Sequence, residues 1–426
     1  MPVKKLITFL QDDVFSTRTF RRSTLTISAT VASGVLGLLF YMVVARNLGP
    51  SAFGIFAVSV AVLNLIADIG DVGTDTGLIR FVGKYAGSNN LVIKFLKLAW
   101  EVKMLVWLVV LITGWIVSEP LSIHLFNKPE LTEPLRWAFL GVGGVMFLSF
   151  SSHGLQALQR YKIWSLLLVG SNTSRIIVTF IVIFLLGLNL QKAVLVYITI
   201  PFVFFGISLL FLPNFIKAKN EFGIAREFFQ FNRWIFMISI IAAATARMDT
   251  FLATRLVSIE QVGIYSVAAQ LTSFIPQFFF AIATVAAPKL AAFKDKRQVL
   301  PYLWKLQFFC LGLALIGFLG IPIAYFIIPN FYGVSYVESF KPFVVLYLAQ
   351  LIFLIALPSH QAIFYFFAKP AIFVWVAMGQ FLLVSLLAIF LIPQFGIMGA
   401  ALSVLAGNLF NFVLPLIWVI LKFKND

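Results

Sequence analysis

Residues 45–87 read ARNLGPSAFGIFAVSVAVLNLIADIGDVGTDTGLIRFVGKYAG, and the pattern of this stretch recurs along most of the chain. Its centre, residues 52–79, is longer than the roughly 20 mostly apolar residues that a helix needs to cross a bilayer. Basic residues flank it on both sides, with Arg46 before it and Arg80 and Lys84 at its end. The stretch therefore predicts a membrane-spanning helix.

The whole composition follows the same pattern, with 61% hydrophobic and 11% charged residues, whereas a soluble domain carries roughly 25% charged residues. This composition excludes a soluble globular protein. We predict an all-α polytopic membrane protein with twelve transmembrane helices. The predicted spans lie near residues 24–44, 52–79, 98–118, 135–158, 163–187, 193–212, 233–256, 260–287, 302–328, 342–367, 371–393 and 397–421.

The positions of the basic residues predict how the chain is oriented. Most of the 32 Lys and Arg residues fall before the first span, in alternate loops and after the last span. Cytoplasmic loops are enriched in Lys and Arg, so we expect both termini on the cytoplasmic side of the cytoplasmic (inner) membrane. Orientation and contact with anionic lipids then account for the net charge of +16. Nucleic acid is not an expected partner.

The two halves of the sequence resemble one another. Residues 40–81 align without a gap onto residues 249–290 at a constant offset of 209. Because each copy carries six spans, the copies are predicted to be parallel repeats related by an axis along the membrane normal. The identical pairs are Arg46 with Arg255, Gly54 with Gly263, Ile55 with Ile264, Val58 with Val267 and Ile66 with Ile275.

This repeat predicts the domain organisation. Residues 1–212 form a six-helix lobe with a cytoplasmic N-terminal segment, and residues 233–426 form a second six-helix lobe. The polar, amphipathic stretch 213–232 is predicted to be a cytoplasmic linker between them. Two lobes that can rock about a central cleft are typical of a transporter that works by alternating access.

Arg175 is the clearest candidate for a substrate-binding residue. It lies midway along the span 163–187, next to Asn172 in a polar patch. A charge at this depth costs at least about 2.5–3.5 kcal/mol and normally faces a cavity. Arginine suits phosphate because its planar fork donates two parallel hydrogen bonds. The alternative is a structural ion pair with an acid on another helix.

Arg247 and Asp249 form a second candidate site, within the span 233–256. Residues two apart lie on different faces of a helix, so the two cannot pair with each other as i,i+4 neighbours would. Each needs its own partner or water. Substrate contact and an interhelical lock both remain open for this pair.

Acidic residues follow one stripe of the span 52–79. Asp68, Asp71 and Asp75 recur at spacings of three and four residues, which places them on one helix face. Asp68, Asp71 and the nearby Arg80 are candidates for a gate or an ion-coupling site. The alternative is a solvated inner helix end, which depth favours for Asp75.

Arg46 and Arg255 complete the candidate substrate-binding set. They lie at the outer ends of the spans 24–44 and 233–256. Arginines at such positions commonly extend to the lipid headgroups, which is the alternative to substrate contact.

The sequence contains no motif for catalysis or for a cofactor. It has a single cysteine, Cys310, no Walker-type GxxxxGK[ST] loop and no HExxH motif or Cys/His cluster with ligand spacing. We therefore expect a transporter with neither a cofactor nor a metal, and not an enzyme.

The stretch 45–87 resembles the opening helices of polysaccharide transport proteins, the Wzx-type lipid-linked oligosaccharide flippases. Its counterpart LVSIEQVGIYSVAAQLTSFIPQFFFAIATVAAPKLA, residues 256–291, is similar to helices 7 and 8 of the same family. The resemblance implies the V-shaped, two-lobe fold of multidrug and toxin extrusion (MATE) transporters. It also implies a cationic cleft that receives the diphosphate and sugars of a polyprenyl-linked glycan, a role that Arg175 and Arg247 fit by their chemistry.

The implied function is flipping of a lipid-linked oligosaccharide from the inner to the outer leaflet for cell-surface polysaccharide assembly. A polysaccharide polymerase and other assembly proteins are further expected partners. One alternative is a cation-coupled exporter of drugs, which needs a cleft carboxylate such as Asp68 or Asp249. Another is a lipid II flippase, although those proteins usually have fourteen spans.

Overall fold

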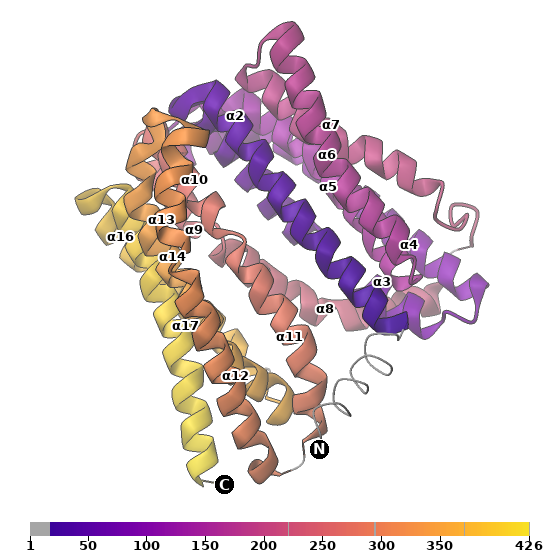
Figure 1. Ribbon diagram of the computed structural model, residues 1–426. Coiled ribbons are helices and arrows are strands. Elements are labelled where there is room, and N and C mark those ends of the chain that lie inside the picture. Colours follow the sequence, from indigo (N-terminus) through magenta and orange to yellow (C-terminus); the bar gives the residue numbers. More distant parts are fainter. Residues whose placement is uncertain (1–17, 220, 294, 370, 426) are drawn as a thin grey trace.

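The computed structural model describes residues 18–425 except 220, 294 and 370. The basic N-terminal segment therefore lies mostly outside the described residues. Two arms of helices meet at one end of the molecule and diverge toward the other, in a V (Figure 1). We call the diverging end, where α2 begins and α17 ends, the near end. The opposite end is the far end.

The first arm is built from the first half of the chain. Its helices are α2 (Arg18–Gly70), α3 (Thr74–Lys84), α4 (Asn89–Pro120), α5 (Thr132–Ala157), α6 (Tyr161–Leu186) and α7 (Leu190–Leu209). A π-helical turn, η2 (Leu121–Leu125), and a 3-10 turn, η3 (Pro129–Leu131), connect α4 to α5.

The second arm contains shorter and more broken helices. They are α8 (Phe222–Thr245), α9 (Met248–Leu256), α10 (Ile259–Thr272), α11 (Ile275–Ala292), α12 (Lys296–Gly317), α13 (Gly320–Ile327), α14 (Phe340–Ile355), α15 (Leu357–Gln361), α16 (Ala371–Phe395) and α17 (Ile397–Asn425). The turns η4 (Ile328–Tyr332) and η5 (Val334–Ser339) follow α13, and η6 (Ala362–Phe366) follows α15.

The number of membrane crossings is compatible with the prediction. Within the described residues, eleven helical stretches are long and apolar enough to cross a membrane. The first of them, Thr24–Gly70, contains the predicted span 24–44 and most of the span 52–79. Both parts belong to one helix, α2, that kinks where Gly49 adopts φ 75° and Pro50 follows. A glycine at positive φ and a proline together redirect a helix without a loop.

Several predicted spans are interrupted. The span 52–79 breaks after Gly70, where Val72 and Gly73 have positive φ, and continues as α3. The span 233–256 breaks between α8 and α9 at Arg247, and 260–287 breaks between α10 and α11, just before Pro276. Broken helices at membrane depth are tolerated where neighbouring groups or a cavity satisfy the freed backbone.

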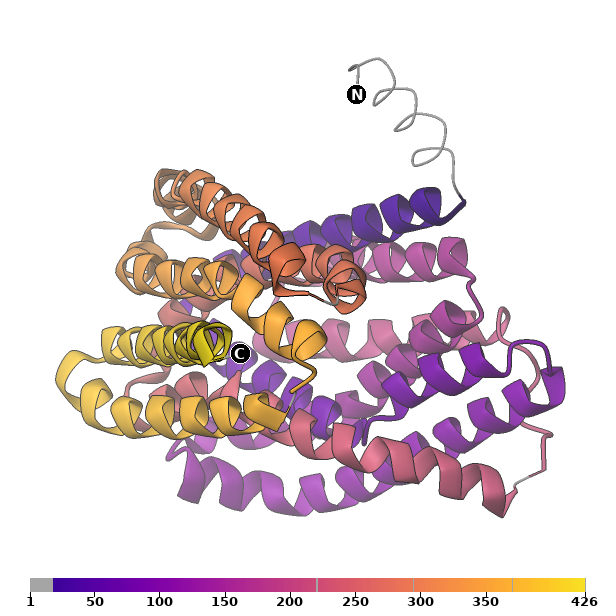
Figure 2. The ribbon, with the colours of Figure 1, turned by 90° about the horizontal axis from the view of Figure 1, so that it is seen from below.

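Helix α8 passes from one arm to the other. It contacts α2, α3 and α4 of the first half and α16 of the second. The view from the near end shows it running along one side of both arms (Figure 2). It begins inside the stretch 213–232 expected to be the linker, so the connection between the halves is partly helical.

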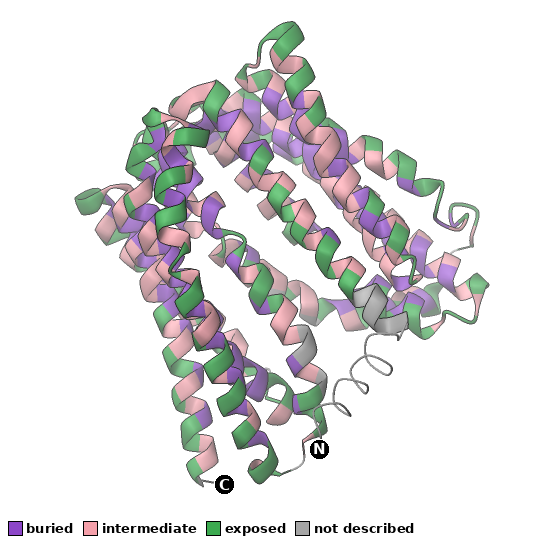
Figure 3. Ribbon diagram, viewed as in Figure 1, coloured by how far each residue is buried: buried purple, intermediate pink, exposed green. Residues whose placement is uncertain are grey.

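Buried residues gather between the helices, and exposed ones follow the outer faces (Figure 3). One apolar core extends across both halves and includes Phe53, Tyr265 and Tyr336. Large apolar side chains such as Phe184 and Trp375 are more than 70% exposed. In a membrane protein such residues face lipid, so this surface agrees with the predicted fold class.

Candidate functional site

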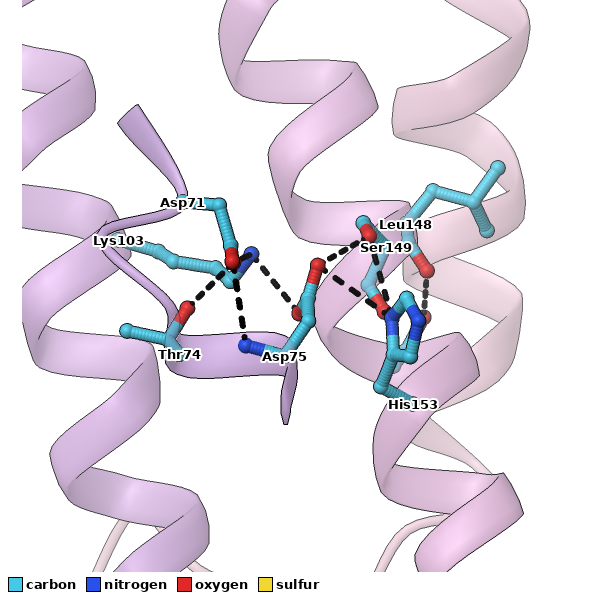
Figure 4. A network of polar contacts seen from close by, with 8 residues as sticks. Asp71, Thr74, Asp75, Lys103, Leu148, Ser149 and His153 are labelled. Atoms are coloured by element: carbon cyan, nitrogen blue, oxygen red, sulfur yellow. Dashed lines mark hydrogen bonds and ion pairs between the residues drawn. The ribbon is translucent and has the colours of Figure 1, made fainter. Parts of the chain in front are cut away.

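A charged network lies where α2 ends and α3 begins (Figure 4). The Lys103 ammonium on α4 is 2.7 Å from Asp71 Oδ1 and 2.9 Å from Asp75 Oδ1. On α5, His153 Nδ1 lies 3.3 Å from the other oxygen of Asp75, and the Ser149 hydroxyl donates to that same oxygen. Three helices of the first half thus converge on two carboxylates.

The break after Gly70 places these carboxylates. The Asp71 side chain accepts hydrogen bonds from the Thr74 hydroxyl at 2.7 Å and from the Asp75 amide at 3.1 Å. It therefore binds a free amide of the first turn of α3, as a helix-capping carboxylate does. This geometry directs Asp71 and Asp75 toward the same lysine.

Lys103 is fully buried. A buried charge is tolerated when it is paired and hydrogen-bonded, and two acids satisfy that need here. The interpretation of Asp75 as part of a solvated helix end is wrong, because its side chain is only 14% exposed and contacts Lys103 and His153.

A cavity of about 530 Å³ adjoins the network. Its walls come from the first half and from α8, with Ser239, Ala242, Ala243 and Ala246 on the α8 side. Arg247, at the break between α8 and α9, donates to Asp68 Oδ2 on α2 at 2.8 Å. This ion pair lies in the cavity lining and joins one half of the chain to the other.

Asp249 lies apart from this cavity lining. It is buried, and it accepts a short hydrogen bond from the hydroxyl of Tyr265 on α10. Arg247 and Asp249 therefore have separate partners, as their spacing predicts.

Arg175 on α6 contacts aromatic rings. Its guanidinium carbon lies 4.4 Å from the ring centre of Tyr197 and 5.4 Å from that of Phe40. Its polar contact with Asn172 is long, at 3.5 Å, and Asn172 itself donates to Ser33 on α2. Within the described residues no carboxylate forms an ion pair with Arg175. Its expected role in binding an anion stays a prediction.

Arg175 and Asn172 lie outside the cavity lining, as do the three remaining predicted residues. Arg46 and Arg255 each donate to backbone carbonyls of the opposite half at the far end. Arg80, near the end of α3, stacks on Phe231 of α8 with its guanidinium carbon 4.2 Å from the ring centre.

A second contact between α3 and α8 lies close to Arg80. Lys84 Nζ is 2.9 Å from a carboxylate oxygen of Glu227. Hydrogen bonds with Tyr85 and Glu227 raise the pKa of Lys84 above its ordinary value. The near end of α3 is thus held to α8 by a charged pair and a stacked arginine.

The structure therefore brings Asp68, Asp71 and Arg247 together at one cavity. Sequence reasoning missed Lys103, Asp75 and His153 as members of the site. The available signals were the i,i+4 spacing of Asp71 and Asp75 and a lysine inside a span, because such a charge requires a partner. The distance between Lys103 and the acids along the chain concealed the pairing.

A family model described as polysaccharide biosynthesis protein matches residues 20–294. The chain belongs to this family. A protein of Shigella flexneri that carries a provisional assignment as an O-antigen transporter is 23% identical over 395 residues. That alignment covers 84% of this chain and 87% of the Shigella protein.

Solved structures of transporters share the fold of this family member. An inward-facing MATE multidrug resistance transporter of the MOP superfamily matches with a TM-score of 0.75 at 14% identity. The match covers 95% of this chain and 98% of that one. The lipid II flippase MurJ, in an inward closed conformation, matches with a TM-score of 0.72 at 18% identity, over 93% of this chain and 87% of MurJ. The predicted MATE-like fold is confirmed.

Proposed function

We propose that this protein moves a polyprenyl-diphosphate-linked oligosaccharide from the inner to the outer leaflet by alternating access. Membership in the polysaccharide biosynthesis protein family and the transporter fold support a transporter in cell-surface polysaccharide assembly. The similarity to an O-antigen transporter supports a lipid-linked glycan as the cargo. A polysaccharide polymerase and anionic lipids are the proposed partners.

The proposed setting is the cytoplasmic membrane, with both termini in the cytoplasm. Residues 1–212 and 233–426 act as the two moving lobes, and residues 213–232 connect them. In this orientation the near end is cytoplasmic. The V then corresponds to an inward-open state, with the lobes joined at the outer side.

The observation that carries the proposal is the ion pair between Arg247 and Asp68 at the cavity wall. A diphosphate can replace the Asp68 carboxylate on Arg247, because both are anions that accept hydrogen bonds from a guanidinium. The Asp68 side chain is 53% exposed, so its displacement from Arg247 does not leave an unpaired buried charge. Arg175, with no carboxylate partner among the described residues, supplies the second positive charge.

The charges of the cavity disfavour a cation-coupled drug exporter. Asp71 and Asp75 are already bound to Lys103, and Asp68 is bound to Arg247. A cation would have to displace these internal positive charges. A lipid II flippase would use the same diphosphate chemistry, so substrate comparison must separate that alternative.

The test is flipping of a fluorescent polyprenyl-diphosphate sugar in proteoliposomes containing equal amounts of inserted protein. Arg175→Ala and Arg247→Ala are each expected to lower the flipping rate at least tenfold. Asp68→Asn is expected to keep most of the rate, because it removes the lock and leaves the anion-binding arginine. Arg136→Ala, a change to an arginine that pairs with Glu133 on its own helix, is the matched control.

The Asp68 variant distinguishes the role of Arg247 in binding the diphosphate from its role in the ion pair with Asp68. Equal losses in Arg247→Ala and Asp68→Asn would mean that Arg247 acts only as a lock. Full flipping in both Arg175→Ala and Arg247→Ala would overturn the site assignment.

A further inference from the structure

Arg46 and Arg255, at matching positions of the two sequence copies, each reach into the opposite half at the far end. Arg46 Nη1 donates to the carbonyl oxygen of Asn330 at 2.6 Å and contacts the next carbonyl at 3.5 Å. Arg255 Nη1 donates to the carbonyl oxygen of His124 at 2.7 Å and to the next carbonyl as well. The two contacts are therefore reciprocal.

The acceptors are equivalent as well. Asn330 lies in the π-helical turn η4 and His124 in the π-helical turn η2. Each turn directly follows a helix, α13 in one half and α4 in the other. The last carbonyls of a helix lack partners within the helix and carry partial negative charge, so a guanidinium both satisfies and neutralises them.

Gly54 and Gly263, another identical pair of the repeat, form a close backbone contact in this region. A Cβ atom on Gly54 would lie 2.1 Å from the carbonyl oxygen of Ile259, and one on Gly263 would lie 2.0 Å from that of Pro50. Helices α2 and α10 thus touch backbone to backbone. Two of the five identical pairs of the repeat therefore consist of residues that join the two halves.

Both arginines are exposed. Water or a phosphate oxygen can therefore replace each carbonyl without burying a charge, so these contacts can break and form again. The close glycine contact has no comparable replacement, because it consists of packed backbone atoms. Opening at the far end is thus easiest by release of the arginines while the glycine contact serves as a pivot.

We propose that Arg46 and Arg255 are paired latches that hold the far end closed, and that both must release before that end opens. The inference rests on the alternating access of the proposed function but needs no knowledge of the cargo. It also accounts for two arginines that sequence analysis assigned to substrate. They would control which side the cavity faces.

The test is a distance measurement by pulsed electron paramagnetic resonance on the full chain in lipid nanodiscs, without substrate. Spin labels at Glu130→Cys and Glu338→Cys report the far end, and labels at Asn90→Cys and Gln298→Cys report the near end. All four positions are exposed. The chain's single native cysteine, Cys310, is buried and adds little background.

The double variant Arg46→Gln with Arg255→Gln is expected to raise the far-end-open population about fivefold and to shorten the near-end distance. Each single variant should give a smaller shift, because one latch remains. Lys128→Gln, a change to another basic residue of the far-end loops, should leave both distributions as in the wild type. Substitution of both arginines by lysine, which keeps the charge but not the fork, should give an intermediate shift.

An unchanged far-end distribution in the double glutamine variant would overturn the latches. If that variant fails to fold, wild-type distributions in the folded double lysine variant would overturn them equally. Either result leaves the proposed function standing, since flipping is measured separately. Absence of flipping by the wild type, together with the expected distance changes in the double glutamine variant, would contradict the proposed function instead.

Discussion

Lys103 illustrates, at the scale of one residue, how this chain holds charge inside a membrane protein. Its ammonium contacts two carboxylates and its side chain is fully buried. Removing one partner of a buried ion pair leaves the other without compensation, which typically costs 3–5 kcal/mol. Loss of the lysine alone should therefore destabilise the protein more than the joint loss of all three charges.

Lys103→Met is expected to destabilise the protein by about 3 kcal/mol, because it removes the ammonium group that both Asp71 and Asp75 contact. Adding Asp71→Asn and Asp75→Asn should recover much of that loss. Thermal unfolding of the purified protein, followed by tryptophan fluorescence, measures both effects. The control is Lys162→Met, at an exposed position near the start of α6. A Lys103→Met variant as stable as the wild type would refute the structural role of the network.

At the scale of the elements, close contact between α2 and α10 depends on two glycines. Ile259 and Pro50 contribute backbone atoms to this contact, and backbone cannot rotate away as a side chain can. The kink at Gly49 and Pro50 directs the second part of α2 into this crossing. The same segment therefore redirects the chain and joins the halves.

Gly54→Ala is expected to destabilise the protein by about 1–3 kcal/mol, the usual cost of overpacking a tight contact. The cost of the clash should outweigh the roughly 1 kcal/mol by which alanine stabilises a helix relative to glycine. Gly34→Ala is the matched control in the same helix, because nothing lies within 4 Å of the added Cβ. Thermal unfolding of both variants is the measurement, and equal stability of the two would contradict the close crossing.

The sequence predicted the helices better than their interruptions. Hydropathy locates spans because it is averaged over about 19 residues, but the breaks at Arg247 and after Gly70 depend on a few residues. A break lies just before Pro276, whereas the helix α7 continues through Pro201. The sequence repeat pairs Arg46 with Arg255, but their acceptors are backbone carbonyls, which have no signature in the sequence.

At the scale of the whole molecule, two arms join at the far end and diverge at the near end (Figure 1). Contacts at the near end between α3 and α8 include the Lys84–Glu227 pair and Arg80 on Phe231. These contacts and the Arg247–Asp68 pair link α8 to the first half. Movement of α8 relative to α2 and α3 would thus change the cavity and the near end together.

The central claim is that wild-type protein flips a glycan attached to a polyprenyl diphosphate. The most direct measurement compares flipping rates in proteoliposomes for three cargoes: the diphosphate-linked oligosaccharide, a lipid II analogue and a cationic dye. We expect clear acceleration over protein-free liposomes for the diphosphate-linked oligosaccharide, slower movement of lipid II and no movement of the dye. Dye transport without movement of either diphosphate lipid would contradict it.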